Sequence, residues 1–296
     1  MSDRPFGAQM RRFYFAVAAL TLYVAFWGFF FPGGLPVALP GFAKGFDDAL
    51  PFDLAIPPLH ARFIGAFYLA ATVGLVYLAR RARRWSDARI FTWVILAWTA
   101  MLGWVSFLHF EIFDWTRPPV VAWFPAYVLF PLYAGWLVWR GQTSPTLVAD
   151  GSLPLVLRTL FFALAIGLVP LALALFLVPE AMVGLWPWKI LPILAQVYSA
   201  PFLAFGVGGL LSARARAWSE VRGFVYTLIA FALGTLVASA MHRALFDPGR
   251  PVTWVWFAAF GIGLVLAIWG AASRPRGTAR GAAAQAGVDP PGGEAR

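Results

Sequence analysis

The chain has 296 residues, of which 61% are hydrophobic and only 12% are charged. A soluble domain carries roughly 25% charged residues, so the composition excludes a water-soluble globular fold. Cysteine is absent, which excludes disulfides, thiolate metal ligands and a cysteine nucleophile. The net charge of +10 would suit nucleic-acid binding if the basic residues formed one patch, but they are distributed along the chain.

Apolar segments of about twenty residues follow one another along the chain, each long enough to cross a hydrocarbon core of roughly 30 Å. We expect transmembrane helices at 13–31, 61–79, 90–109, 120–139, 159–178, 190–211, 223–242 and 253–271. The first segment follows Arg11 and Arg12, as a signal peptide would, but it exceeds the usual signal core of roughly 7–15 residues, so we expect it to be retained. The sequence therefore predicts an all-α, polytopic membrane helical bundle of eight helices.

The orientation follows from the basic residues, which accumulate on the cytoplasmic side of a membrane. With the N-terminus inside, the cytoplasmic segments hold 17 of the 23 Lys and Arg residues, and the outer segments hold 6. This predicts a cell-membrane protein with both termini cytoplasmic. It also predicts contact with the lipid bilayer, with anionic lipid at the cytoplasmic face, and gives no reason to expect a nucleic-acid partner.

The chain resembles itself at an offset of 133 residues. Residues 85–131 align with 218–264 without a gap, with 14 identities in 47 positions. We therefore expect a first four-helix repeat at 1–145, with a long outer loop at 32–60, and a second at 146–272. Each repeat has an even number of crossings, so the two should be parallel and related by an axis along the membrane normal. The remaining residues, 273–296, have no apolar periodicity and are expected to form a disordered cytoplasmic tail.

The outer ends of the third and seventh predicted helices carry the same polar residue types. The matched residues are Ser106, His109, Asp114 and Arg117 in the first copy and Ser239, His242, Asp247 and Arg250 in the second. A spacing of three residues places each Ser and His on one helix face. His60 and Arg62 begin the second predicted helix, and ionisable groups beside the hydrocarbon are candidate functional residues.

Two interpretations of these residues stay open. In the first, both faces turn toward the repeat axis, where paired His and Asp bind a ligand or pass protons. In the second, each Asp pairs with the Arg three residues later and fixes its own loop, while the Pro that follows begins the next helix. The spacing contains no H-x-x-x-H or H-x-x-E pattern, so no metal site is predicted.

An inner motif, Trp85 to Arg89, recurs as Trp218 to Arg222 and combines an interfacial Trp with a helix-starting Ser and acid. We expect its role to be structural. The glycines of the sixth predicted helix, including Gly206, Gly208 and Gly209, favour close helix packing over a cavity.

Three functions remain. The first is binding or transport of a small molecule or lipid at an outer-face site between the two repeats. The second is an accessory subunit without its own chemistry, which would have a membrane-protein partner. The third is a membrane enzyme that uses the paired His residues, which we favour least because no catalytic residue, P-loop or dinucleotide-binding pattern can be identified. No cofactor is predicted.

Overall fold

A computed structural model describes residues 4–34, 46, 56–141 and 153–273, and it confirms the all-α bundle. Eight helices of the described part are long and apolar enough to cross a membrane. They are α1 (Ala8–Ala25, continued by the π-helical turn η1, Phe26–Phe30), α3 (Pro58–Arg81), α4 (Trp85–Leu108), α5 (Pro119–Gly141), α6 (Leu155–Leu177), α8 (Pro192–Arg214), α9 (Trp218–Met241) and α10 (Pro251–Ala272). Most of the expected loop at 32–60 and all but the first residue of the expected tail at 273–296 lie outside the described residues.

Most helices begin before the residue predicted for them, and the reason lies in their first turns. Four of the eight helices start at a proline, namely α3, α5, α8 and α10, although α8 begins two residues after its predicted start. The fixed φ of proline suits the first helical position, and its missing N–H needs no partner there. The helices α4 and α9 start at Trp85 and Trp218, five residues before the predicted starts at 90 and 223. In a membrane the helix is also the simplest way to satisfy every backbone group.

Three short elements were not expected from the sequence. The helix α7 (Pro179–Leu185) follows α6 directly, and the single turns η2 (Phe110–Ile112) and η3 (Arg243–Leu245) follow α4 and α9. All three lie at the end of the bundle that carries the three histidines, which we call the histidine end. The opposite end, where Arg80 and Arg81 close α3, is called the basic end.

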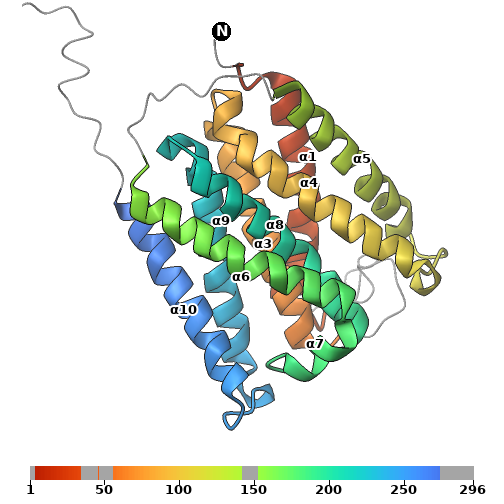
Figure 1. Cartoon of the computed structure of the whole chain (residues 1–296). Coiled ribbons are helices and arrows are strands. Elements are labelled where there is room, and N and C mark those ends of the chain that lie inside the picture. The colour runs from red at the N-terminus through yellow and green to blue at the C-terminus, as the bar shows by residue number, and fades with distance from the viewer. Residues whose placement is uncertain (1–3, 35–45, 47–55, 142–152, 274–296) are drawn as a thin grey trace, which may run out of the picture.

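Four helices, α3, α4, α8 and α9, form the centre of the bundle. The helix α3 packs along α9, α4 packs along α8, and α4 also touches α9, whereas α3 and α4 barely meet although they are consecutive. The outer helices each cover one central helix: α1 lies on α3, α5 on α4, α6 on α8 and α10 on α9 (Figure 1). The first half of the chain (4–141) and the second half (153–273) are therefore interleaved.

At the basic end, two acids tie the halves together. The Asp87 carboxylate accepts hydrogen bonds from the backbone N–H groups of Arg83 and Arg84, at 2.9 and 3.3 Å, and so caps α4. Glu220 caps α9 in the same way, and its other oxygen lies 2.7 Å from the guanidinium of Arg89 on α4. The reciprocal pair, Arg222 with Asp87, has an N···O distance of 3.8 Å. The inner motif thus has the expected structural role: it starts a helix and forms an ion pair between the two halves. The groups that cap α4 and α9 are the carboxylates of Asp87 and Glu220 rather than serine hydroxyls.

Other contacts at the basic end also occur twice. The Phe6 N–H donates to the Arg83 carbonyl at 2.9 Å, and the Leu153 N–H donates to the Arg216 carbonyl at 2.8 Å. The Arg11 side chain donates to carbonyls at the end of α3, including that of Ala82 at 2.9 Å, and Arg158 donates to the Ala213 carbonyl near the end of α8. Basic side chains at a helix C-terminus satisfy its free carbonyls.

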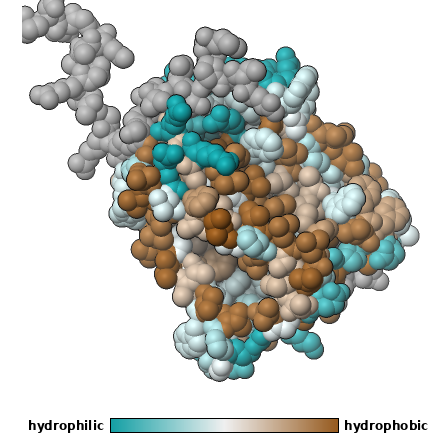
Figure 2. Space-filling model, in the orientation of Figure 1, coloured by the Kyte–Doolittle hydropathy of each residue, from teal (hydrophilic) through white to brown (hydrophobic). Residues whose placement is uncertain are grey.

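The glycines of α8 serve close packing, as expected. A Cβ atom on Gly209 would lie 2.9 Å from the Phe161 carbonyl oxygen of α6, and one on Gly208 would overlap the Phe224 ring of α9. The outer surface shown in Figure 2 is a brown apolar band with hydrophilic residues concentrated toward its two ends, as a membrane-spanning bundle requires.

Candidate functional site

Each candidate serine is bonded to a tryptophan of the following helix. The Trp123 indole N–H donates to the Ser106 hydroxyl at 3.1 Å, and the Trp256 indole N–H donates to Ser239 at 3.0 Å. Both serines are buried, and Ser106 in turn donates to the Leu102 carbonyl at 2.8 Å. The serines therefore join α4 to α5 and α9 to α10 near the histidine end.

His109 turns toward the second half of the chain. Its Nε2 lies 2.5 Å from Oε1 of Gln196 on α8, while the Gln196 amide N–H donates to the Phe176 carbonyl at 3.1 Å. Because the amide nitrogen must be the donor to that carbonyl, Oε1 faces the imidazole and His109 donates through Nε2–H. The other ring nitrogen lies 3.8 Å from the exposed carboxylate of Glu111.

His242 makes the corresponding contact, but it accepts the hydrogen bond instead of donating it. Its Nε2 lies 2.8 Å from a guanidinium nitrogen of Arg62 on α3. A guanidinium can only donate, so this imidazole nitrogen accepts and the ring is neutral. Burial and the neighbouring Arg62 charge both lower the pKa of His242, in agreement with that assignment.

His60 also reaches the other half. Its Nδ1 is 2.8 Å from the Tyr198 hydroxyl of α8 and 3.4 Å from the indole nitrogen of Trp188. The indole N–H can only donate, so Nδ1 is the accepting nitrogen of this ring. The two rings of His60 and Tyr198 lie nearly parallel, and both side chains are buried. All three histidines thus hydrogen-bond a side chain from the opposite half.

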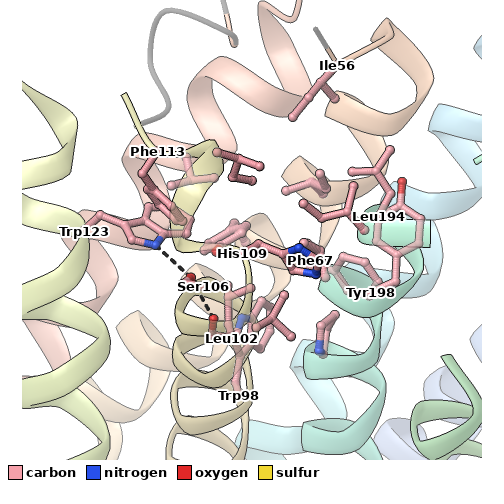
Figure 3. A pocket seen from close by; sticks show the side chains of 18 residues that line it. Ile56, Phe67, Trp98, Leu102, Ser106, His109, Phe113, Trp123, Leu194 and Tyr198 are labelled. Carbon is pink, nitrogen blue, oxygen red and sulfur yellow. Dashed lines mark hydrogen bonds between the residues drawn. The ribbon is translucent and has the colours of Figure 1, made fainter. Parts of the chain in front are cut away.

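A cavity of about 50 Å³ lies beside His109 where α3, α4 and α5 meet α8 (Figure 3). A water molecule needs roughly 10–15 Å³ by this measure, so several heavy atoms fit. Its walls are mostly apolar. The polar groups are those of Ser106, His109, Trp123, Tyr68 and Tyr198, the last of which comes from the second half.

A smaller cavity of about 30 Å³ lies deeper in the bundle. Tyr68 and Trp98 line both cavities and separate them. The Tyr68 hydroxyl is 2.6 Å from that of Tyr127, and Thr21 and Thr99 face the deeper space. The two cavities are thus separate spaces that share walls formed by Tyr68 and Trp98.

The two loops at the histidine end differ. In the first, the Arg117 guanidinium lies 3.1 Å from the Asp114 carboxylate, as the loop interpretation predicts. The hydroxyl and the N–H of Thr116 bond the same carboxylate, and together with Arg117 they lower the pKa of Asp114.

The same pairing expected in the second loop is wrong. Asp247 accepts from the Gly249 N–H at 2.8 Å, while Arg250 donates to the Gly184 carbonyl at 2.7 Å. Asp247 and Arg250 form no ion pair in the described structure. The reason is α7, which presents a free carbonyl where the first half has no corresponding helix among the described residues.

The structure gathers some of the candidate residues and separates others. Ser106 and His109 share the first cavity, whereas Ser239 and His242 do not line it. His60 and Arg62 on α3 meet Tyr198 and His242, respectively. Within the described ranges, no group of three or more His, Asp or Glu residues could hold a metal ion.

Sequence reasoning missed Tyr198 and Trp188 as partners of His60. Trp188 is buried in an aromatic cluster with Trp186 and Trp256, whereas Trp near the end of a span is typically found at the lipid headgroups. Nothing in the sequence around Tyr198 or Trp188 distinguishes them from aromatic residues that face lipid. The matched Ser and Trp, seventeen residues apart in both copies, were visible in the sequence and could have been predicted as a bonded pair.

The fold and the site define a class, that of multi-pass, all-α membrane-spanning helical proteins. Protein-family models, curated proteins and solved structures give no match to this chain.

Proposed function

We propose that this protein binds a small molecule or lipid group at the histidine end, in the cavity between two tandem four-helix repeats. The observation that carries this proposal is the 50 Å³ cavity beside His109, which takes residues from both halves of the chain. A mostly apolar cavity with a few convergent polar groups is typical of ligand sites. The ligand class it fits is small and largely apolar, with one group that hydrogen-bonds His109 or Tyr198.

The repeat is supported by the contacts that occur twice. They include the Trp–Ser hydrogen bonds and the caps of α4 and α9 by Asp87 and Glu220. They also include the backbone hydrogen bonds that Phe6 and Leu153 donate to the carbonyls of Arg83 and Arg216. The residues of the first two contacts correspond in the aligned copies, and the acceptors of the third, Arg83 and Arg216, each lie two residues before the aligned stretch.

The orientation we favour places the histidine end outside, because the arginine-rich basic end suits the cytoplasmic face of a cell membrane and its anionic lipids. Both chain termini would then be cytoplasmic. Alkaline phosphatase fused to the C-terminus should be inactive. An active fusion would show that the protein has the opposite orientation.

Binding is supported better than transport. Tyr68 and Trp98 divide the interior into two small cavities, and no charged side chain lines either one. Transport would require both aromatic side chains to move.

A mass-spectrometric comparison tests the binding site. The protein would be purified in mild detergent and analysed intact for bound small molecules, beside Leu102→Trp, which fills the cavity, and Leu132→Trp, which adds the same ring on the exposed surface. We expect wild type and Leu132→Trp to carry a bound molecule that Leu102→Trp lacks. Because the larger ring can disturb folding, His109→Phe provides a second variant that should weaken retention while keeping ring packing.

If all four proteins carry the same bound molecules, or none carries any, the cavity is not a binding site. The small size of both cavities then favours the second candidate, an accessory subunit. In that case a stoichiometric membrane-protein partner should co-purify with wild type and with every cavity variant alike.

A further inference from the structure

A second apolar space, larger than either cavity, lies between α6 and α10. It has a volume of about 530 Å³, its floor is formed by α8 and α9, and α7 lies at its histidine end. In Figure 1 the two helices diverge toward the histidine end, and the corresponding surface in Figure 2 is apolar and recessed. Every side chain that lines this groove is aliphatic or aromatic, including Phe202, Phe205 and Phe231 on the floor.

The corresponding surface of the first half, between α1 and α5, is a more open hollow lined mainly by bulky side chains. There Phe13 of α1 packs against Phe130 and Tyr133 of α5, with ring centroids 5.9 and 4.7 Å apart. The offset of 133 residues aligns Phe130 with Gly263 and Tyr133 with Leu266. Smaller side chains therefore line the α10 side of the groove.

Close packing does not explain the glycine at position 263. A Cβ atom added to Gly263 would meet no other atom within 4 Å. A larger side chain would be accommodated there without displacing the backbone, so the glycine keeps the groove open.

The size of the groove selects its occupant. The groove has a volume of about 530 Å³. Ligand pockets range over roughly 300–1,000 Å³. A flexible apolar chain fits the space, and a helix could insert only some of its side chains.

A cationic group lies at the rim of the groove. Arg250 joins α10 to the Gly184 carbonyl of α7, and Gly184 stands between the lining residues Met182 and Leu185. Its guanidinium forms no ion pair within the described part of the chain and retains donors for an anion. A phosphate at this depth would complement it through charge-assisted hydrogen bonds.

We propose that this groove binds one acyl chain of an anionic phospholipid, with the phosphate beside Arg250. The site goes beyond the cavity beside His109, because no residue lines both spaces. The methylene groups of the acyl chain would pack against the aromatic floor of the groove. The phosphate would interact with the Arg250 charge, and this interaction would select anionic lipids.

Lipid titration of the purified full-length protein tests the proposal. Dioleoyl phosphatidylglycerol would be added in detergent, and bound lipid would be counted by native mass spectrometry beside Gly263→Phe and Gly261→Phe. Both substitutions add the same ring to α10 in open space, but only position 263 lines the groove. We expect Gly263→Phe to weaken the tightest lipid site by about tenfold or more and Gly261→Phe to leave it unchanged.

Arg250→Gln tests the headgroup. It should weaken phosphatidylglycerol binding about threefold to tenfold and reduce the preference for it over dioleoyl phosphatidylcholine. Equal lipid binding by wild type and Gly263→Phe would overturn the proposal, as would a wild type without a saturable lipid site. A wild-type dimer that Gly263→Phe dissociates, without any lipid effect, would assign the groove to a second protein chain and also overturn it.

Discussion

In the first half of the bundle, the Tyr68 hydroxyl meets that of Tyr127 at 2.6 Å, and the Tyr14 hydroxyl meets that of Thr92 at 2.8 Å. The offset of 133 residues places Phe260 and Val225 at the positions of Tyr127 and Thr92, and Phe202 matches Tyr68 when Pro58 is aligned with Pro192. The first half therefore has buried hydroxyl pairs where the second half has aromatic or aliphatic side chains. The interiors of the two halves differ in polarity, although in each half the outer helices cover the central helices in the same order.

The histidine pairs differ in the same manner. His109 donates a hydrogen bond to Gln196, whereas His242 accepts one from Arg62. Gln196 and Arg62 occupy corresponding positions when Pro58 is aligned with Pro192. A neutral amide in one copy and a cation in the other thus reverse the proton arrangement of an otherwise matched contact.

The largest effect is expected at the basic end, where Glu220 is more deeply engaged than Asp87. The Glu220 side chain is 1% exposed, caps α9 and pairs with Arg89 at 2.7 Å, whereas the Asp87 pair is longer. Arg89 is one-third exposed, so water partly screens the lost pair. We expect Glu220→Ala to destabilise the protein by about 2–4 kcal/mol, and Asp87→Ala to cost less.

The measurement is the thermal unfolding temperature in one detergent, with Glu220→Gln as the control that keeps a capping oxygen without the charge. Glu220→Gln should fall between wild type and Glu220→Ala. If Asp87→Ala lowers the unfolding temperature more than Glu220→Ala, the N···O distances of the two ion pairs do not determine their contributions to stability.

Removing one hydroxyl of the Tyr68–Tyr127 pair should destabilise the protein more than removing both. Tyr127→Phe removes the hydroxyl partner of the buried Tyr68 and leaves it only the Trp98 indole, so we expect a loss of about 1 kcal/mol. The double variant Tyr68→Phe/Tyr127→Phe has the aromatic pair of the second half and should recover part of that loss. Unfolding temperatures of the single and double variants check this; additive losses would mean that the hydroxyls act independently.

The helices themselves could be predicted from the sequence because lipid imposes strong constraints on length and polarity. The eight spans, the Pro-initiated helix starts and the polar residues at the histidine end follow from apolar run length and the placement of Arg, Trp and Pro. The self-alignment further predicted that Asp87 and Glu220 would have the same role. These features depend on local sequence.

The pairing of helices could not be predicted in this way. Helix α3 packs on α9 rather than on its neighbour α4, because the partner is chosen by the fit of distant surfaces such as Gly223 against Leu78. For the same reason His60 was identified without Tyr198. The partner of Arg250 was missed because it is a backbone carbonyl of α7, a helix too short to give a periodic signal.

The His242 contact should make stability depend on pH. The folded structure lowers the pKa of His242, so below the ordinary value of about 6.5 the unfolded chain binds a proton more readily than the folded chain. The contribution is complete above that pH and is lost as the pH falls below it. We expect the unfolding temperature of wild type to fall more between pH 7.5 and 5.5 than that of His242→Gln, which keeps an acceptor for Arg62 but does not titrate. Equal pH dependence in the two proteins would assign the effect to other groups.

The smallest effects are expected in the two exposed loops, where the halves differ in how an Asp and an Arg are used. Asp114 and Arg117 face each other directly, so the exchange Asp114→Arg/Arg117→Asp should retain more stability than either single change. Asp247 and Arg250 bond backbone groups instead, and a carboxylate at position 250 cannot donate to the Gly184 carbonyl. The exchange Asp247→Arg/Arg250→Asp should therefore be no better than Arg250→Asp alone. Expression level and unfolding temperature of the six variants measure both cycles in parallel. A rescue in the second loop equal to that in the first would show that the residues pair there too, and that α7 is not what separates the two loops.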